Sequence, residues 1–125
     1  MNTTPTYRIA IAVSALGAVL HLYENLAKST EPSVGWFLWA LVPYVLCLAV
    51  WARSGTGAPA LAGVLLALAL DLYMHYGVFI HPTSSTAALG MIFIPLWSAI
   101  LVCPVAMLLA WLAVRRRSPV RSDAP

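Results

Sequence analysis

The sequence has very little charge for its length. Only 9% of its 125 residues are charged, whereas 62% are hydrophobic. A soluble domain typically carries about 25% charged residues, so a chain of this composition cannot cover its apolar surface with polar groups in water. The shortage of charge therefore excludes an ordinary soluble domain and indicates that most of the chain lies in lipid.

The sequence also lacks the short motifs of common enzymes. It contains no CxxC or HExxH metal motif, no glycine-rich phosphate loop and no nucleophile elbow. Cysteine is scarce, because Cys47 and Cys103 are the only two. Each lies within an apolar run and their estimated depths differ, so free thiols are expected rather than a disulfide. No basic face on a soluble domain is available for nucleic acid, and nothing in the sequence indicates an enzyme.

Four long apolar runs take up most of the chain, at residues 7–27, 34–52, 58–80 and 87–114. Each is near or above the ~20 residues that span a hydrocarbon core. The joins between them are short, which makes successive helices antiparallel neighbours. The runs therefore predict an all-α integral membrane protein. We expect one domain over residues 1–125, an up-down-up-down bundle of four transmembrane helices, and a basic tail at 115–125.

The basic residues predict the orientation of this bundle. All of the arginines fall on one side of the topology and only Lys28 falls on the other. The arginines are Arg8, Arg53, Arg115, Arg116, Arg117 and Arg121. Because cytoplasmic loops are enriched in Lys and Arg, we expect a multi-pass protein of the plasma (inner) membrane with both termini in the cytoplasm.

The third apolar run carries an acid in its middle. A charged side chain near the bilayer centre costs about 2.5 to 3.5 kcal/mol, so Asp71 requires a partner. Residues three, four and seven apart share a helix face, which places Gly63, Ala67, Asp71 and His75 on one stripe. The stripe begins with small residues that let another helix approach closely. It ends with polar ones.

The first apolar run repeats this pattern. Ala10 and Ser14 form its small-residue part, and His21, Glu24 and Asn25 follow towards its end. The helical rise puts His21 and Glu24 about 21 and 26 Å from the start of their helix, and the same count puts the two polar residues of the third run about 18 and 24 Å from theirs. The first and third helices run in the same direction, so all these side chains should meet in the outer half of the bundle.

Two readings of this cluster stay open. Histidines and carboxylates at these spacings, namely His21, Glu24, Asp71 and His75, would be able to hold a zinc or a similar divalent ion. Alternatively, the side chains only hydrogen-bond one another and set the helix register. Our leading interpretation is a small binding or accessory membrane subunit. Its outer pocket, formed by these four residues and Asn25, would bind a cation, a polar ligand or a partner helix.

Two further functions are alternatives to this one. A small proton-coupled transporter would use Asp71 to load and unload a proton. A haem protein would use His21 and His75 as its two axial ligands, although the neighbouring carboxylates argue against haem. In each case the partners are the lipid bilayer and either other membrane subunits or further copies of the chain.

The aromatic and proline residues are given structural roles. Trp36 is expected to lie in the outer aromatic belt of the membrane interface, without a role in binding. Pro43, Pro95 and Pro104 each lack a backbone N–H, so kinks are expected near all three. A bent fourth helix would widen the outer half of the bundle.

Overall fold

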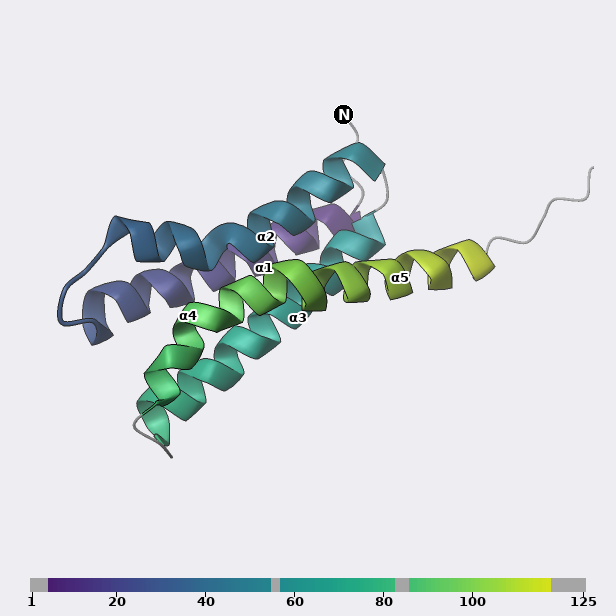
Figure 1. Ribbon diagram of the computed structural model, residues 1–125. Helices are drawn as coiled ribbons and strands as arrows, with labels where there is room; N and C mark the ends of the chain where they lie inside the picture. Colours follow the sequence, from purple (N-terminus) through teal and green to yellow (C-terminus); the bar gives the residue numbers. More distant parts are fainter. Residues whose placement is uncertain (1–4, 55–56, 83–85, 118–125) are drawn as a thin grey trace, which may run out of the picture.

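The computed structural model describes residues 5–54, 57–82 and 86–117, and every regular element within them is a helix (Figure 1). The elements are α1 (Pro5–Tyr23), η1 (Glu24–Lys28), α2 (Val34–Ser54), α3 (Gly57–His75), η2 (Tyr76–Ile80), α4 (Ala87–Trp97), η3 (Ser98–Val102) and α5 (Cys103–Arg117). The η elements are π-helical turns that continue α1, α3 and α4 without a break. The prediction of an all-helical fold is confirmed.

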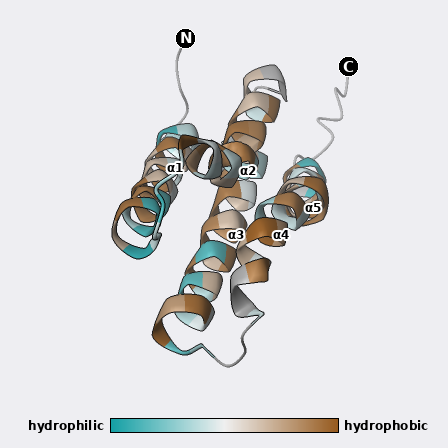
Figure 2. Ribbon diagram, turned by 60° about the vertical axis from the view of Figure 1, so that its left-hand side comes forward, coloured by the Kyte–Doolittle hydropathy of each residue, from teal (hydrophilic) through white to brown (hydrophobic). Residues whose placement is uncertain are grey.

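The described residues form four continuous helical stretches, each with a segment that is long and apolar enough to cross a membrane. These segments are Pro5–Lys28, Val34–Ala52, Gly57–Ile80 and Leu89–Arg116. Hydrophobic residues run along each helix in Figure 2, and many of their large side chains are exposed. The last helix continues to Arg117, past the expected start of the basic tail at residue 115, and residues 118–125 lie outside the described part.

The helix α3 is the central one. Of its most apolar window 44% is buried, against 22–28% in the other three, and it packs against α1, α2 and α5. The small residues of its stripe face the interior, since Gly63 and Ala67 are both buried. The buried core around them consists of Ala10, Tyr44, Cys47, Val64, Ala67, Leu68, Cys103 and Met107.

Neighbouring helices pack closely around Gly63. A Cβ atom there would come within 2.6 Å of Cys47 Sγ and 3.1 Å of Met107 Cγ. The thiol of Cys103 donates to the Gly63 carbonyl at 3.6 Å. Both cysteines are free and buried, as expected, but their predicted difference in depth is wrong, because both contact the same glycine. The depth estimate assumed straight helices, whereas the last helix bends before Cys103.

Contacts between the ends of α1 and α2 position the first two helices. Tyr7, near the start of α1, stacks on Trp51, near the end of α2, with ring centroids 3.4 Å apart and an interplanar angle of 13°. Beyond the other end of α1, the Asn25 amide forms two hydrogen bonds with the backbone of Ser33, just before α2 begins. The two helices therefore lie against each other over most of their length.

The last helix changes direction at its middle. Figure 1 shows α4 and α5 at a clear angle to each other. The π-helical turn η3 lies at this junction, directly after the part of α4 that contains Pro95 and just before Pro104. Because each proline removes one backbone donor, the regular ladder of hydrogen bonds is interrupted here. The helix α2, in contrast, continues through Pro43.

Candidate functional site

His21 joins two buried carboxylates. Its Nδ1 atom lies 3.0 Å from Glu24 Oε2, and its Nε2 atom lies 3.0 Å from Asp71 Oδ2. Glu24 is three residues further along the same helical stretch, so it falls on the same side as His21. Asp71 comes from α3. The imidazole ring therefore links the end of α1 to the middle of the central helix.

These contacts continue in both directions. Glu24 Oε1 lies 2.8 Å from His75 Nδ1, and the Tyr44 hydroxyl donates to Asp71 Oδ2 at 2.6 Å. The result is a continuous series of hydrogen bonds through His75, Glu24, His21, Asp71 and Tyr44, here called the polar chain. Glu24, Asp71 and His21 expose only 5%, 7% and 8% of their surfaces. The sequence-predicted cluster is thus brought together, with a tyrosine added to it.

Two π-helical turns lie beside the polar chain. The turn η1 begins at Glu24 and is closed by a hydrogen bond from the Ser29 N–H to the Glu24 carbonyl at 3.1 Å. The turn η2 begins directly after His75 and is closed by His81. Such turns often occur at functional sites, where they change the direction of a side chain. Here they flank the residues that join across α1 and α3.

Counting protons gives the charge of the polar chain. Each of the three contacts between a histidine nitrogen and a carboxylate oxygen holds one proton. Two neutral histidines bring one proton each, so a third must be added to His21 or to one of the acids. Before this proton is added, two neutral histidines and two ionised carboxylates have a summed charge of −2. The added proton contributes +1. The polar chain, with all of these hydrogen bonds formed, therefore has a net charge of −1 when His75 carries a single proton.

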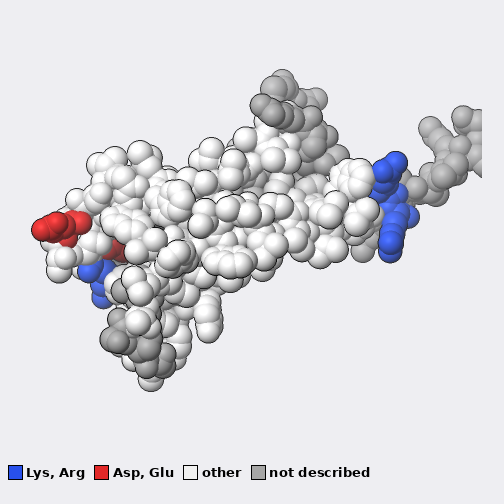
Figure 3. All heavy atoms as spheres, in the orientation of Figure 1, with Lys and Arg blue, Asp and Glu red and all other residues white. Residues whose placement is uncertain are grey.

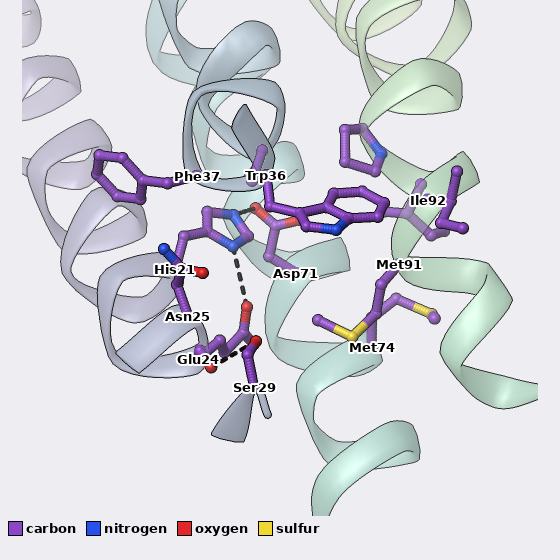
Figure 4. A pocket seen from close by; sticks show the side chains of 13 residues that line it. His21, Glu24, Asn25, Ser29, Trp36, Phe37, Asp71, Met74, Met91 and Ile92 are labelled. Atoms are coloured by element: carbon purple, nitrogen blue, oxygen red, sulfur yellow. Dashed lines mark hydrogen bonds and ion pairs between the residues drawn. The ribbon is translucent and has the colours of Figure 1, made fainter. Parts of the chain in front are cut away.

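A cavity of about 230 Å³ lies beside the polar chain and is partly open to the outside (Figure 4). It is formed by α1 with η1, α2, α3 and α4. The residues that line it are His21, Glu24, Asn25, Ser29, Trp36, Phe37, Ala40, Asp71, Met74, Met91, Ile92, Ile94 and Pro95. The acids and the bridging histidine thus form part of its wall.

The predicted site residues do not all occupy this wall in the same way. His21, Glu24 and Asp71 line the cavity, but His75 does not, and it reaches the site through Glu24. Asn25 lines the cavity, yet its amide is already bonded to Ser33, donating to the carbonyl at 3.1 Å and accepting from the N–H at 2.9 Å. Asn25 therefore fixes the polypeptide backbone at Ser33, just before α2 begins.

Sequence reasoning missed two important residues of the site. Trp36 was assigned to the membrane interface without a role in binding, and the structure places it in the cavity wall. Tyr44 was not assigned to the site at all. Its ring packs against Gly17, where a Cβ atom would lie 2.6 Å from the Tyr44 hydroxyl oxygen. The small residue on α1 thus makes room for the phenol, a complementarity that spacing within one helix does not reveal.

The donor atoms are arranged for one another rather than for a metal. Among residues 5–54, 57–82 and 86–117, no group of three or more His, Cys, Asp or Glu side chains is placed to hold a metal ion. Both ring nitrogens of His21 contact carboxylates, and Glu24 lies between His21 and His75. A carboxylate group therefore bridges the two imidazoles that were considered as axial haem ligands. The Lys28 ammonium group lies over the Tyr23 ring, 5.9 Å from the ring centroid.

Comparisons of the chain with protein-family models, with curated proteins and with solved structures found no match. No relative therefore supplies a substrate or a partner for it. Its function is inferred from the geometry of the cavity and of the polar chain alone.

Proposed function

We propose that the protein is a four-span integral membrane protein that binds a small positively charged ligand in its cavity, from the non-cytoplasmic side. The observation that carries this proposal is the bridge from His21 to two buried acids on the cavity wall. Membrane insertion and orientation are parts of the proposal, and each has its own support.

The distribution of charge supports the membrane orientation. On the face shown in Figure 3, basic side chains gather at the end of α5, while acidic and basic side chains lie together at the opposite end of the molecule. The helix α5 ends with Arg115, Arg116 and Arg117. The excess of arginine favours a cytoplasmic location for this end. The contacts of Tyr7 with Trp51 and of Asn25 with Ser33 support antiparallel neighbouring helices.

The charge of the polar chain supports a cationic ligand. With its hydrogen bonds complete and His75 carrying a single proton, the polar chain has a net charge of −1, and its two acids are buried. An unneutralised charge in a low-dielectric interior is costly, so a positive group beside it is favourable. Asp71 and Glu24 line the cavity, and a ligand cation held there would lie close to both.

The direct test is binding of tetramethylammonium to the purified protein in dodecyl maltoside micelles, which are uncharged. Calorimetry should show saturable binding, and Asp71→Asn should weaken it at least tenfold, because the amide keeps the hydrogen bonds but removes the negative charge. Glu31→Gln is the matched control, since Glu31 is exposed and does not line the cavity. Absence of binding to the unmodified protein would refute the proposal.

A second candidate is transport of the cation in exchange for protons. It is favoured by the unbroken hydrogen bonds from the cavity wall to His75, which lies outside the lining. Such a series of groups can pass protons between two environments. In proteoliposomes, an outward gradient of tetramethylammonium would then drive protons into the lumen, and a pH-sensitive dye would report it. Binding without this proton movement would support the binding function alone.

A further inference from the structure

We infer that the ligand is a small organic ammonium ion that carries an apolar group, rather than an inorganic cation. This inference rests on the proposed binding of a cation in the cavity and names the chemical class of that cation. Its basis is the division of the cavity wall into a polar part and a larger apolar part.

The polar part of the wall is small. It consists of His21, Glu24, Asn25, Ser29 and Asp71. The remaining lining residues, from Trp36 on α2 to Pro95 on α4, are all apolar. An inorganic ion would use only the polar part, and its water shell would lie against apolar side chains without hydrogen bonds. A cation with an apolar group would contact both parts of the wall.

The free acceptor capacity of the acids is also limited. Asp71 Oδ2 already contacts His21 and accepts from Tyr44, and each Glu24 oxygen contacts one histidine. Hard cations such as Ca²⁺ require about six to eight oxygen ligands. A quaternary ammonium ion requires none, because it is attracted by the net negative charge. Three of the four carboxylate oxygens already have hydrogen-bond partners, so binding of a metal ion is disfavoured. The electrostatic attraction for an organic cation does not require free oxygens.

The apolar part of the wall is suited to such a cation. Figure 4 shows the Trp36 ring between Asp71 and Ile92, with the Met74 and Met91 side chains nearby. An aromatic face attracts a cation by about 0.5 to 2 kcal/mol, and thioethers adapt to apolar groups of different shape. Close by, the Trp39 indole N–H donates to the Ile92 carbonyl at 3.1 Å. This bond holds α2 against α4 and keeps the two sides of the apolar wall together.

The size of the cavity limits the ligand. Its volume of about 230 Å³ is below the ~300 to 1,000 Å³ typical of sites for drug-sized molecules. The ligand is therefore expected to carry no more than one ring or one short branched chain beside its ammonium group. We infer that the ligand is a free cation of this kind and not a lipid headgroup, because the acyl chains and glycerol of a whole lipid would have to remain outside the cavity.

The deciding experiment compares benzyltrimethylammonium with tetramethylammonium in dodecyl maltoside micelles. Both carry the same charged group, and only the first has an aromatic ring. Calorimetry should show at least tenfold tighter binding of benzyltrimethylammonium, and excess Na⁺ or Ca²⁺ at equal ionic strength should not displace it specifically. Equal affinity of the two ammonium ions, or displacement by Ca²⁺ at micromolar concentration, would overturn the inference while leaving the proposed cation binding in place. Failure of both ammonium ions to bind would overturn the proposed function itself.

Variants of two tryptophans locate the preference. Trp36→Leu should reduce the ratio of the two affinities to about threefold or less, and Trp36→Phe should restore most of it, because phenylalanine keeps an aromatic face. Trp97→Leu is the matched control, since Trp97 is also exposed in part but does not line the cavity. An unchanged ratio of affinities in folded Trp36→Leu protein would contradict the assignment of Trp36 to the part of the wall that contacts the ligand.

A last competitor distinguishes two sources of the same chemistry. Short-chain phosphatidylcholine carries a quaternary ammonium in its headgroup and should compete at least tenfold more weakly than benzyltrimethylammonium. Equal or stronger competition would contradict the inference that the ligand is a free cation and would indicate a lipid headgroup as the ligand.

Discussion

The two halves of α3 hold their neighbours in different ways. The half that begins at Gly57 presents glycine and alanine, and the adjacent helices pack closely there, with Cys47 and Met107 against Gly63. The half that contains Asp71 and His75 makes hydrogen bonds to α1, η1 and α2, and the cavity lies beside it. One helix thus combines a closed half and an open half.

The difference shows how a small bundle can keep a cavity. In the closed half, dispersion between well-fitted surfaces holds the helices, and small residues are what permit it. In the open half, hydrogen bonds between particular atoms specify the positions of α1 and α2 beside the cavity, without filling all the space between the helices. We expect the polar contacts to be the more sensitive to substitution, because their loss leaves buried groups without partners.

The largest effect is expected for Asp71→Leu. The substitution would leave His21 Nε2 and the Tyr44 hydroxyl without their acceptor in a buried site. Removing one partner from such a group costs about 3 to 5 kcal/mol. Asp71→Asn should cost about 1 kcal/mol, because the amide oxygen still accepts hydrogen bonds at nearly equal volume.

Unfolding in mixtures of SDS and dodecyl maltoside, followed by far-UV circular dichroism, measures the difference. Equal stability of the Asp71→Leu and Asp71→Asn proteins would show that the open half does not depend on its hydrogen bonds. The comparison between the two halves would then fail.

The next effect concerns the closed half. In Gly63→Ala the new methyl group would meet Cys47 Sγ at 2.6 Å, and overpacking of this kind costs about 1 to 3 kcal/mol. Gly77→Ala is the control within the same helical stretch, because no atom lies within 4 Å of its added Cβ. It should be neutral or slightly stabilising, by up to about 1 kcal/mol. If the Gly63→Ala protein were as stable as the Gly77→Ala protein in the same detergent series, the helices around Gly63 would not be closely packed.

The smallest effect is expected for Tyr44→Phe. The substitution removes the hydrogen bond to Asp71 and keeps the ring against Gly17, so the cost is about 0.5 to 1.5 kcal/mol. The substitution also changes the charge that a bound ligand meets. Without the Tyr44 hydroxyl, the negative charge of Asp71 is compensated by one hydrogen bond fewer. Binding of tetramethylammonium should be retained or become tighter, as measured by calorimetry. A loss of binding would mean that Tyr44 orders the site rather than only neutralising Asp71.

Much of the polar chain could be predicted from the sequence. The 3.6-residue period places polar residues on one face of each helix, and the constant rise per residue gives their depth. These two regularities are local, and they were sufficient to bring His21, Glu24, Asp71 and His75 together. Asn25 was placed in the same region by the same reasoning, but its amide bonds the backbone of Ser33.

Composition and helical geometry are properties of single segments, so they were sufficient to predict the helical class, the four long apolar helices and the level at which the polar residues meet. Which residues from other segments complete the site depended on how the helices pack against one another. Tyr44 reaches Asp71 because Gly17 leaves room for its ring, and Trp36 lines the cavity because α2 lies against α4. The bend at η3 likewise brought Cys103 to the level of Gly63. Each of these depends on the fit between side chains of different helices, and no period within one helix contains that information.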